Sequence, residues 1–380
     1  ISRLIYAHNA PGNGARLQHI LVKALNLLLA RSAEAAGSVP DSVEEVVIVG
    51  NSGMHHLLLN LAADQLIQAP YVPAIRQGLT IKARELGLRV APGAYVYFPP
   101  LIAGFVGSDL LAVALVAQLD RKPGVRLALD IGTNTELLLS VNGQLFCCST
   151  ASGPALEGAA LQYGSVAMPG AVDQVWLKED GLTMANHTIG NRPAIGICGS
   201  GIIDALARMR QAGILSRTGR IQAGRPGVRE ETDGNHRYVL VPSEATGLGA
   251  ELTISQADVR AIQLAKGAIR AGIETVLSEH GLSSEALDEI VVAGAFGSHL
   301  RVESALAIGL FPPLPPERIR QVGNAAGAGA ELLLLSTDER RLAESLSQQI
   351  QYTELAANRG FARRFAAAQW FPIDNERQMS

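Results

Sequence analysis

Charged and aromatic residues are scarce in this sequence of 380 residues, at 18% and 4%. The net charge is −3, and the chain contains no long run of lysine and arginine. Binding to the phosphate backbone of nucleic acid requires a positively charged surface, because the phosphates must be neutralised by cations. The composition therefore argues against a nucleic-acid partner.

Cysteine is also rare, with Cys147, Cys148 and Cys198 in the whole sequence. Their spacing matches neither a zinc site nor an iron–sulfur site. We expect reduced thiols of a cytoplasmic protein. Because neighbouring residues of a strand point to opposite faces, Cys147 and Cys148 are predicted to be small buried residues without a chemical role.

No membrane segment or leader is predicted. The most apolar window, 101–119, approaches the length of a membrane span but contains Gly104, Gly107, Ser108 and Asp109. A strand end, a turn and a buried helix fit it better. Residues 1–17 hold two arginines and a Pro-Gly-Asn turn instead of a continuous apolar stretch, so we expect no signal peptide in them. Because the sequence starts without methionine, we expect a fragment of a longer protein.

The length, with 48% hydrophobic residues, favours two packed lobes with a cleft between them. We place the boundary at 121–124, so that 1–121 is a first lobe ending in a helix and 122–380 is the second lobe. The first third alternates helices and strands, which predicts a parallel sheet. The expected elements are a helix over 17–33, a strand over 45–50, a helix from about Met54, a strand over 95–98 and a helix over 108–119.

From Arg126 onward the pattern changes to short strands. We expect strands over 126–131, 136–141 and 144–149, with Asn142-Gly143 as a hairpin turn between the last two. A helix over 256–280 with Ser255 as N-cap and a buried strand over 289–293 follow. The chain from Asn324 to its end is predicted to be largely helical.

The segment Asp130 to Glu136 is the sharpest chemical signal: an acidic residue at a strand end, then a tight turn of small and hydroxyl residues. Such a turn can direct backbone N–H groups at a phosphate while the carboxylate holds Mg²⁺ through water. A plain hairpin with Asp130 and Asn134 as turn formers is the alternative. We expect the turn to face the cleft.

Two further glycine-rich turns lie where strands meet helices, at 198–201 before a helix with Asp204, and at 293–297 after a buried strand. The second is a candidate adenosine platform, although an ordinary strand-to-helix turn is the commoner outcome for a single glycine pair. Small residues also fill the helices that start near Asp109 and Asn324. We expect these two helices to cross closely between the lobes, which would account for Gly327 and Gly329 inside a helix.

Taken together, these segments resemble the C-terminal ATPase domain of reductive activators of corrinoid proteins, within the superfamily of acetate and sugar kinases, Hsp70 and actin. The resemblance runs nearly end to end. The similar segments are Ile1-Ser2-Arg3, 49–56, 98–100, 104–109, 129–136, 153–158, 198–204, Ala265-Lys266, 293–297, 323–326 and Phe371-Pro372. The implied fold class is α/β, a two-lobed actin-like or sugar-kinase-like ATPase fold whose first lobe is incomplete at its N-terminus.

The resemblance also implies a site. Asp109 and Asp130 would be catalytic, with Asp130 holding Mg²⁺ through water, and Asp109 orienting the attacking water or acting as base. An ordinary first-turn carboxylate is the alternative for Asp109. The implied nucleotide-binding residues are Gly132, Thr133, Asn134, Thr135, Glu136, Gly199, Ser200, Gly201, Gly294, Phe296, Gly297, Gly323 and Asn324.

The implied function is ATP-dependent reductive activation of a corrinoid protein, Co(II) to Co(I), with ATP and Mg²⁺ as cofactors. The expected partner is a corrinoid protein, with a homodimer as a second expectation. The resemblance implies that full-length relatives carry a ferredoxin-like 2Fe-2S domain, a middle domain and a first phosphate hairpin upstream. All three are expected to be missing here, so we expect weak ATP binding. A small-molecule kinase and a non-catalytic partner-binding module remain alternatives, and His55 and His56 have no assigned role.

Overall fold

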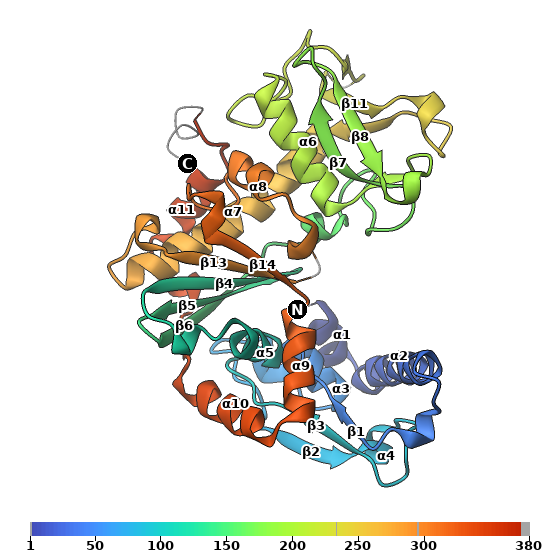
Figure 1. Ribbon diagram of the computed structural model, residues 1–380, viewed down its shortest axis with the longest axis vertical. Helices are drawn as coiled ribbons and strands as arrows, with labels where there is room; N and C mark the ends of the chain where they lie inside the picture. Colours follow the sequence, from blue (N-terminus) through green and yellow to red (C-terminus); the bar gives the residue numbers. More distant parts are fainter. Residues whose placement is uncertain (1, 233, 295, 374–380) are drawn as a thin grey trace. The chain divides into compact units, whose positions relative to one another are not determined.

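The computed structural model describes residues 2–232, 234–294 and 296–373, and the packing of the chain divides it into two units (Figure 1). Unit 1 consists of Ile1–Gly124, Ser140–Cys147 and Asn324–Thr353, and unit 2 consists of Val125–Leu139, Cys148–Gly323 and Glu354–Ser380. Two residues of the family-like segments, Ile1 and Ala295, lie outside the described residues.

Unit 1 combines helices with a small mixed sheet. Its helices are α1 (Ser2–Asn9), α2 (Asn13–Ala35), α3 (Ser52–Leu58), α4 (Ala83–Leu86), α5 (Ser108–Ala117), α9 (Ala325–Leu335) and α10 (Thr337–Gln349). Its sheet has the order β1-β3-β2, with β1 (Glu45–Val47), β2 (Leu79–Lys82) and β3 (Tyr95–Phe98).

The prediction of a parallel sheet in this region is only half right. Strand β1 runs parallel to β3, but β2 pairs antiparallel with β3. Only the one-turn helix α4 lies between β2 and β3, and the chain folds back instead of crossing the sheet. The helix predicted from Met54 starts at Ser52, because Asn51 caps it by accepting a hydrogen bond from the Gly53 amide.

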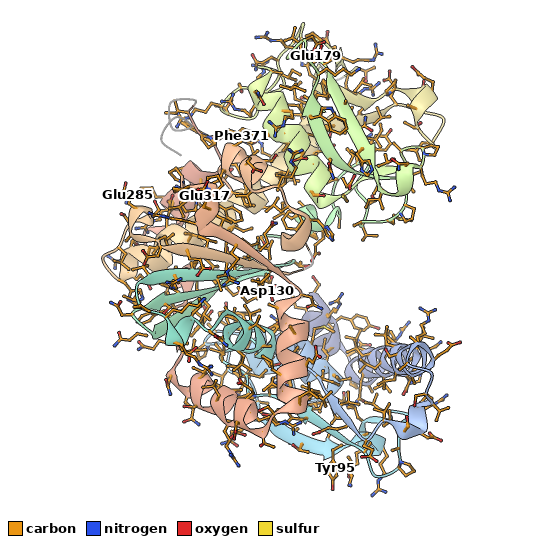
Figure 2. All side chains as sticks on the ribbon, in the orientation of Figure 1. Tyr95, Asp130, Glu179, Glu285, Glu317 and Phe371 are labelled. Carbon is orange, nitrogen blue, oxygen red and sulfur yellow. The ribbon has the colours of Figure 1, made fainter. Side chains whose placement is uncertain are left out.

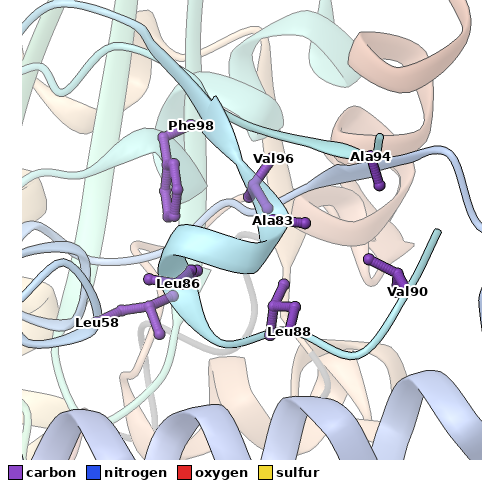
Figure 3. Close-up of a cluster of buried hydrophobic side chains, with 8 residues drawn as sticks. All are labelled: Leu58, Ala83, Leu86, Leu88, Val90, Ala94, Val96 and Phe98. Atoms are coloured by element: carbon purple, nitrogen blue, oxygen red, sulfur yellow. The ribbon is translucent and has the colours of Figure 1, made fainter. Parts of the chain in front are cut away.

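The core of this sheet is formed by eight buried hydrophobic side chains (Figure 3). They come from the end of α3, from α4 and the loop after it, and from β3. They are Leu58, Ala83, Leu86, Leu88, Val90, Ala94, Val96 and Phe98. Leucines and a valine on one side of α2 pack against them, which fixes that helix on unit 1.

Helices α5 and α9 cross at close range, as the small residues of both predict. A Cβ added at Gly329 would lie 2.4 Å from the carbonyl oxygen of Ala112 and 2.6 Å from its Cβ. Both helices belong to unit 1. The close approach of α5 therefore explains why a glycine occupies the interior of α9, where it lowers helix propensity.

Gly329→Ala is expected to destabilise unit 1 by about 1–3 kcal/mol, because the new methyl group overlaps the α5 backbone. Helix propensity alone predicts the opposite sign, a gain of about 1 kcal/mol. Urea unfolding followed by circular dichroism decides between them. Ala328→Gly, at an exposed position of the same helix, measures the local propensity effect, and a stabilised Gly329→Ala variant would contradict the packing argument.

Apart from β15, the remaining elements belong wholly or partly to unit 2. The helices are α6 (Gly199–Gln211), α7 (Gln256–Glu279), α8 (Val302–Ile308) and α11 (Phe361–Ala368). The strands are β4 (Val125–Ile131), β5 (Thr135–Val141), β6 (Gln144–Thr150), β7 (Ala171–Leu177), β8 (Met184–Thr188), β9 (Gly196–Ile197), β10 (Val228–Glu230), β11 (His236–Val241), β12 (Leu252–Ser255), β13 (Glu289–Ala293), β14 (Ile319–Gly323) and β15 (Gln351–Tyr352, in unit 1).

The strands predicted after Arg126 are confirmed and belong to a six-stranded sheet with the order β14-β13-β4-β5-β6-β15. Asn142 and Gly143 both have positive φ, 52° and 88°, as the predicted Asn-Gly turn requires. Strand β13 runs parallel to both β4 and β14. The carboxyl ends of these three strands therefore meet at one edge, where Asp130, Gly294 and Gly323 lie.

Candidate functional site

The turn after β4 is the first part of the candidate site. Gly132 and Asn134 are partly buried and Thr133 is exposed. The Gly132 amide donates to the Asn134 carbonyl oxygen at 3.1 Å, and the Ser152 hydroxyl donates to the Gly132 carbonyl oxygen at 3.1 Å. These two hydrogen bonds stabilise the turn, and Thr133 lies on its exposed side.

Asp130 lies at the end of β4, directly before this turn (Figure 2). Gly294 has a φ of 93°, and a Cβ added there would lie 3.0 Å from the Oδ1 atom of Asp130. Only glycine combines that φ with so close an approach. Burial raises the pKa of the Asp130 carboxyl. A carboxylate that is poorly hydrated and has a raised pKa is stabilised by a bound cation.

The turns after β13 and β14 are joined to each other. The Gly294 amide donates to the Gly323 carbonyl oxygen at 3.0 Å. Gln321, which sequence reasoning missed, donates from its side-chain amide to the carbonyl oxygens of Gly297 and Leu300. It holds the predicted adenosine turn on the edge of the sheet. Asn324, the next residue after Gly323, is the N-cap of α9 and accepts from the Gly327 amide.

The N-terminus of α6 and the turn at Phe296 come together in space. A Cβ added at Gly199 would lie 1.9 Å from the Leu156 carbonyl oxygen and 2.7 Å from the Phe296 ring. They enclose a cavity of about 180 Å³, lined by Leu156, Glu157, Ser165, Val166, Ala167, Cys198, Gly199, Ser200, Phe296 and His299. Most of this lining is apolar, and the Ser165 hydroxyl has no hydrogen-bond partner in the described part of the chain.

Other predicted site residues are placed inside the fold. Thr135 is fully buried and shares a hydrogen bond of 2.9 Å with the Ser152 hydroxyl, and Glu136 accepts from the Ser149 hydroxyl. Gly201 faces β7, since a Cβ there would lie 2.1 Å from the Val172 carbonyl oxygen. Gly297 starts a short 3-10 turn against Val292.

Glu157 belongs to the candidate site. It lies in the family-like segment 153–158, but the sequence alone did not predict a role for it. The Thr133 hydroxyl donates to its carboxylate at 2.8 Å. A Cβ at Gly132 would lie 3.7 Å from the same group. The turn after β4 therefore has a second carboxylate beside it, supplied from 24 residues further along the chain. No group of three or more potential metal-ligating side chains occurs among the described residues.

In unit 1, Asp109 lies in the first turn of α5 and is partly buried. Its Oδ1 atom accepts from the Leu110 amide at 2.9 Å. The preceding Gly107 touches the turn at Gly50, because a Cβ there would lie 2.1 Å from the Gly50 carbonyl oxygen. The family-like segments 49–56 and 104–109 are thereby in contact. This contact fixes the start of α5, where Asp109 lies in the first turn.

The two histidines left unassigned have different environments. The imidazole of His56 bonds to the Ser52 carbonyl oxygen and accepts from the Ala74 amide, each at 2.8 Å, so it is a neutral structural side chain. Among the described residues, His55 has no hydrogen-bond partner at either ring nitrogen and packs edge-on to Phe98. Burial, and then the neighbouring His56, lower the pKa of His55 to about 4. Both are core residues of α3.

Comparison with known proteins assigns this chain to a family. A model described as the C-terminal domain of RACo, the ASKHA domain, matches residues 124–380. One described as the RACo middle region matches residues 1–122, so the expectation that a middle domain is missing is wrong. The solved structure of a reductive activator for corrinoid, iron-sulfur protein is similar to this chain with a TM-score of 0.91 and 33% identity, covering 98% of this chain and 59% of that one.

Two curated relatives are similar in sequence. The corrinoid activation enzyme RamQ of Eubacterium limosum is 34% identical over 376 residues, which is 96% of this chain and 62% of that protein. The Co(II) methylated amine-specific corrinoid protein reductase of Methanosarcina barkeri is 28% identical over 281 residues, 68% of this chain and 48% of that protein. The chain thus spans less than two thirds of the length of these relatives.

The fold is therefore the mixed α/β fold of the ASKHA, actin-like class, a nucleotide-binding class, as the sequence predicts. The chain belongs to the RACo family. Its described helices include none with the length and hydropathy needed to cross a membrane.

Proposed function

We propose that this chain binds ATP with Mg²⁺ and is the ATP-hydrolysing part of a cytoplasmic activator that reduces a corrinoid protein from Co(II) to Co(I). The family and the activities named for its relatives support the proposal. One electron enters the cobalt from a donor of the iron–sulfur class, and ATP hydrolysis supplies the free energy. The corrinoid protein is the proposed partner, and a homodimer is kept as the proposed assembly.

One observation carries the proposal: a half-buried carboxylate, Asp130, lies against the Gly294 turn and directly before the turn at 132–134. Mg²⁺ in ATP sites is held by one or two carboxylates together with phosphate oxygens and water, and not by a full cage of protein ligands. Asp130, with Glu157 beside Thr133, fits that pattern. Glycine at 132 keeps this turn free of a side chain at that position, so a phosphate oxygen can approach the backbone there.

The cavity beside Gly199 and Phe296 fits one end of the nucleotide. At about 180 Å³ it is below the size of pockets that enclose a whole drug-sized ligand, so it suits a base or a ribose and not a triphosphate. The Phe296 ring offers a flat apolar surface to a base. The unpartnered Ser165 hydroxyl and the Ser200 hydroxyl can bond to its polar atoms or to ribose hydroxyls. Asp109 is proposed to orient the attacking water.

Asp130→Asn is expected to weaken binding of Mg²⁺-ATP by about tenfold to a hundredfold, since a neutral amide no longer balances the cation. Isothermal calorimetry with and without Mg²⁺ measures this, and Asp338→Asn, at a carboxylate that is 85% exposed, is the control. Because the Asp130 pKa is raised, binding to the unaltered chain should also weaken as pH falls, and the variant should lose that dependence.

Equal Mg²⁺-ATP affinity in Asp130→Asn and in the unaltered chain would refute the assignment of the metal-binding carboxylate. The activity itself is tested by following Co(I) formation spectroscopically in a corrinoid protein with an iron–sulfur reductant and ATP. Cobalt reduction that proceeds equally without ATP would refute the proposed coupling, and accumulation of a phosphorylated small molecule would instead identify a kinase.

A further inference from the structure

Helix α2 carries aliphatic side chains on two opposite faces. On its inner face, Leu21, Val22, Leu25 and Leu29 pack against the buried cluster of Figure 3. Helices α1 and α3 also contact α2. This inner face accounts for the place of the helix in unit 1, where it lies at the edge (Figure 1).

The opposite face is exposed and largely apolar. Ile20, Leu27 and Leu28 are 55%, 52% and 57% exposed, and Ala24 between them is also exposed. The spacing i, i+4, i+7, i+8 sets these four residues in one stripe along the helix. A single exposed leucine is common on protein surfaces. A continuous apolar stripe along a helix is different, because a partner that buried this area would gain free energy of binding.

Most of the charges near this stripe are positive. The exposed residues Arg16 and Lys23 lie along one edge of the stripe, and exposed Arg31 lies in line with it near its C-terminal end. The acidic residue of α2, Glu34, lies on the same edge as Arg16 but in the last turn, and no acidic residue precedes it in the helix. We call the surface formed by Arg16, Ile20, Lys23, Ala24, Leu27, Leu28 and Arg31 the outer face of α2.

We propose that the outer face of α2 is a docking surface for an amphipathic helix of another protein, with an apolar stripe flanked by glutamate or aspartate. The apolar stripes would bury each other, Arg16 and Lys23 would meet carboxylates along one edge, and Arg31 would meet one near the end of the stripe. Such charges set the partner and its direction, as they do between paired helices. The proposal is independent of the nucleotide site.

Two other occupants fit the outer face less well. A second copy of the chain, packed antiparallel so that Ile20 meets Leu27, would also set Arg16 against Arg31, and like charges oppose that pairing. Helices that lie on anionic membranes bury tryptophan or phenylalanine beside their cations, and α2 contains neither residue. An acidic protein helix satisfies both the apolar stripe and the charges.

The test uses the full chain and a synthetic amphipathic peptide of about three heptads, with leucine at positions a and d and glutamate beside them. A matched peptide carries lysine in place of glutamate. The glutamate peptide is expected to bind at least about tenfold more tightly than the lysine peptide at low salt, with the difference shrinking as salt rises. Fluorescence anisotropy of labelled peptides measures both affinities.

Two double variants separate the contributions. Ile20→Gln with Leu27→Gln should weaken binding of the glutamate peptide by about tenfold or more, and Lys23→Gln with Arg31→Gln should abolish the preference between peptides. Leu335→Gln, at a leucine that is 76% exposed on α9, should change neither. Glutamine favours helices, so circular dichroism should show each variant folded.

Several results would overturn the proposal. Equal binding of both peptides, or binding that the outer-face variants leave unchanged, would show that the face does not select an acidic helix. Binding to vesicles of phosphatidylcholine and phosphatidylglycerol that Ile20→Gln with Leu27→Gln removes would make it a membrane surface. Self-association in analytical ultracentrifugation that the same variant removes would make it an interface between copies of this chain.

Discussion

Replacing Lys266 with methionine is expected to destabilise unit 2 by about 2–5 kcal/mol at pH 10, where little of the free-energy cost of deprotonating the lysine on folding remains. Lys266 is fully buried in α7, and its Nζ atom donates to the carbonyl oxygens of Ala368 and Trp370 at 2.7 Å each. Phe371 covers it, with the ring centre 5.2 Å from Nζ. Methionine fills the same space but leaves two partly buried carbonyl oxygens, at the end of α11 and just after it, without this donor. The C-terminal segment is therefore expected to detach from α7.

The same residue is expected to make stability depend on pH. Burial, and then the nearby Arg270, lower the pKa of Lys266 from 10.5 to about 7. Between these two values the unfolded chain carries a proton that the folded chain lacks, so the free energy of unfolding rises with pH, by at most about 1.4 kcal/mol per pH unit. Below pH 7 both states are protonated, and the contribution no longer changes. The neutral amine keeps two N–H groups for its two carbonyl acceptors.

Tryptophan fluorescence can measure both effects, because the chain has two tryptophans and one of them is Trp370. In a Trp176→Phe background, urea unfolding reports on the C-terminal segment directly. The rise in stability from pH 7 to pH 10 should be present with Lys266 and absent with methionine. Lys178→Met, at an exposed lysine of unit 2, is the control. Parallel pH curves for the Lys266→Met variant and the unaltered chain would show that the lowered pKa of Lys266 does not contribute to the stability of this segment.

Elements with strong local signals could be predicted from the sequence. The long helix α7 starts where Ser255 predicts it, and Ser255 and Asp258 form a reciprocal capping box. The buried strand β13 has the predicted bounds, because a short unbroken apolar run between polar residues is typical of a strand covered on both faces. The turn after β4 was also predicted, since its residues are consecutive and their composition restricts the backbone.

Strands without a local pattern were missed. Strand β9 has two residues and pairs parallel with β7, and β8 is partly exposed along its whole length, so neither gives the alternation of a half-buried strand. The sheets β8-β7-β9 and β10-β11-β12 were therefore not predicted. Their pairing is decided by tertiary packing, which overrides short-range preference.

The contacts that shape the candidate site are also through space. Glu157 meets the turn at Thr133, and Gln321 holds the turn at Gly297, but neither pair has a spacing that indicates contact. The family-like segments Ala265-Lys266 and Phe371-Pro372 were noticed separately, and their joint role is visible only once Lys266 is seen to bind the chain beside Phe371. A motif shows which residues matter, whereas the fold shows what each one touches.

Gly199→Ala is expected to reduce nucleotide affinity by about thirtyfold or more if the cavity at Phe296 holds the base or ribose. The added methyl group would lie 1.9 Å from the Leu156 carbonyl oxygen and 2.7–2.8 Å from two atoms of the Phe296 ring. The carbonyl belongs to the backbone and cannot turn aside, so α6 must shift or the ring must move into the cavity of about 180 Å³. Overpacking of this kind also destabilises, by about 1–3 kcal/mol.

Gly201→Ala is the matched variant for this experiment. Its added methyl group would lie 2.1 Å from the Val172 carbonyl oxygen, an overlap of the same severity on the same helix, but against β7 and away from the cavity. Calorimetry with ATP should therefore show a much larger loss of affinity for Gly199→Ala than for Gly201→Ala, while thermal unfolding shows similar destabilisation. Equal losses of affinity would mean that α6 acts only through stability, and the cavity would then have to be given up as the place of the base or ribose.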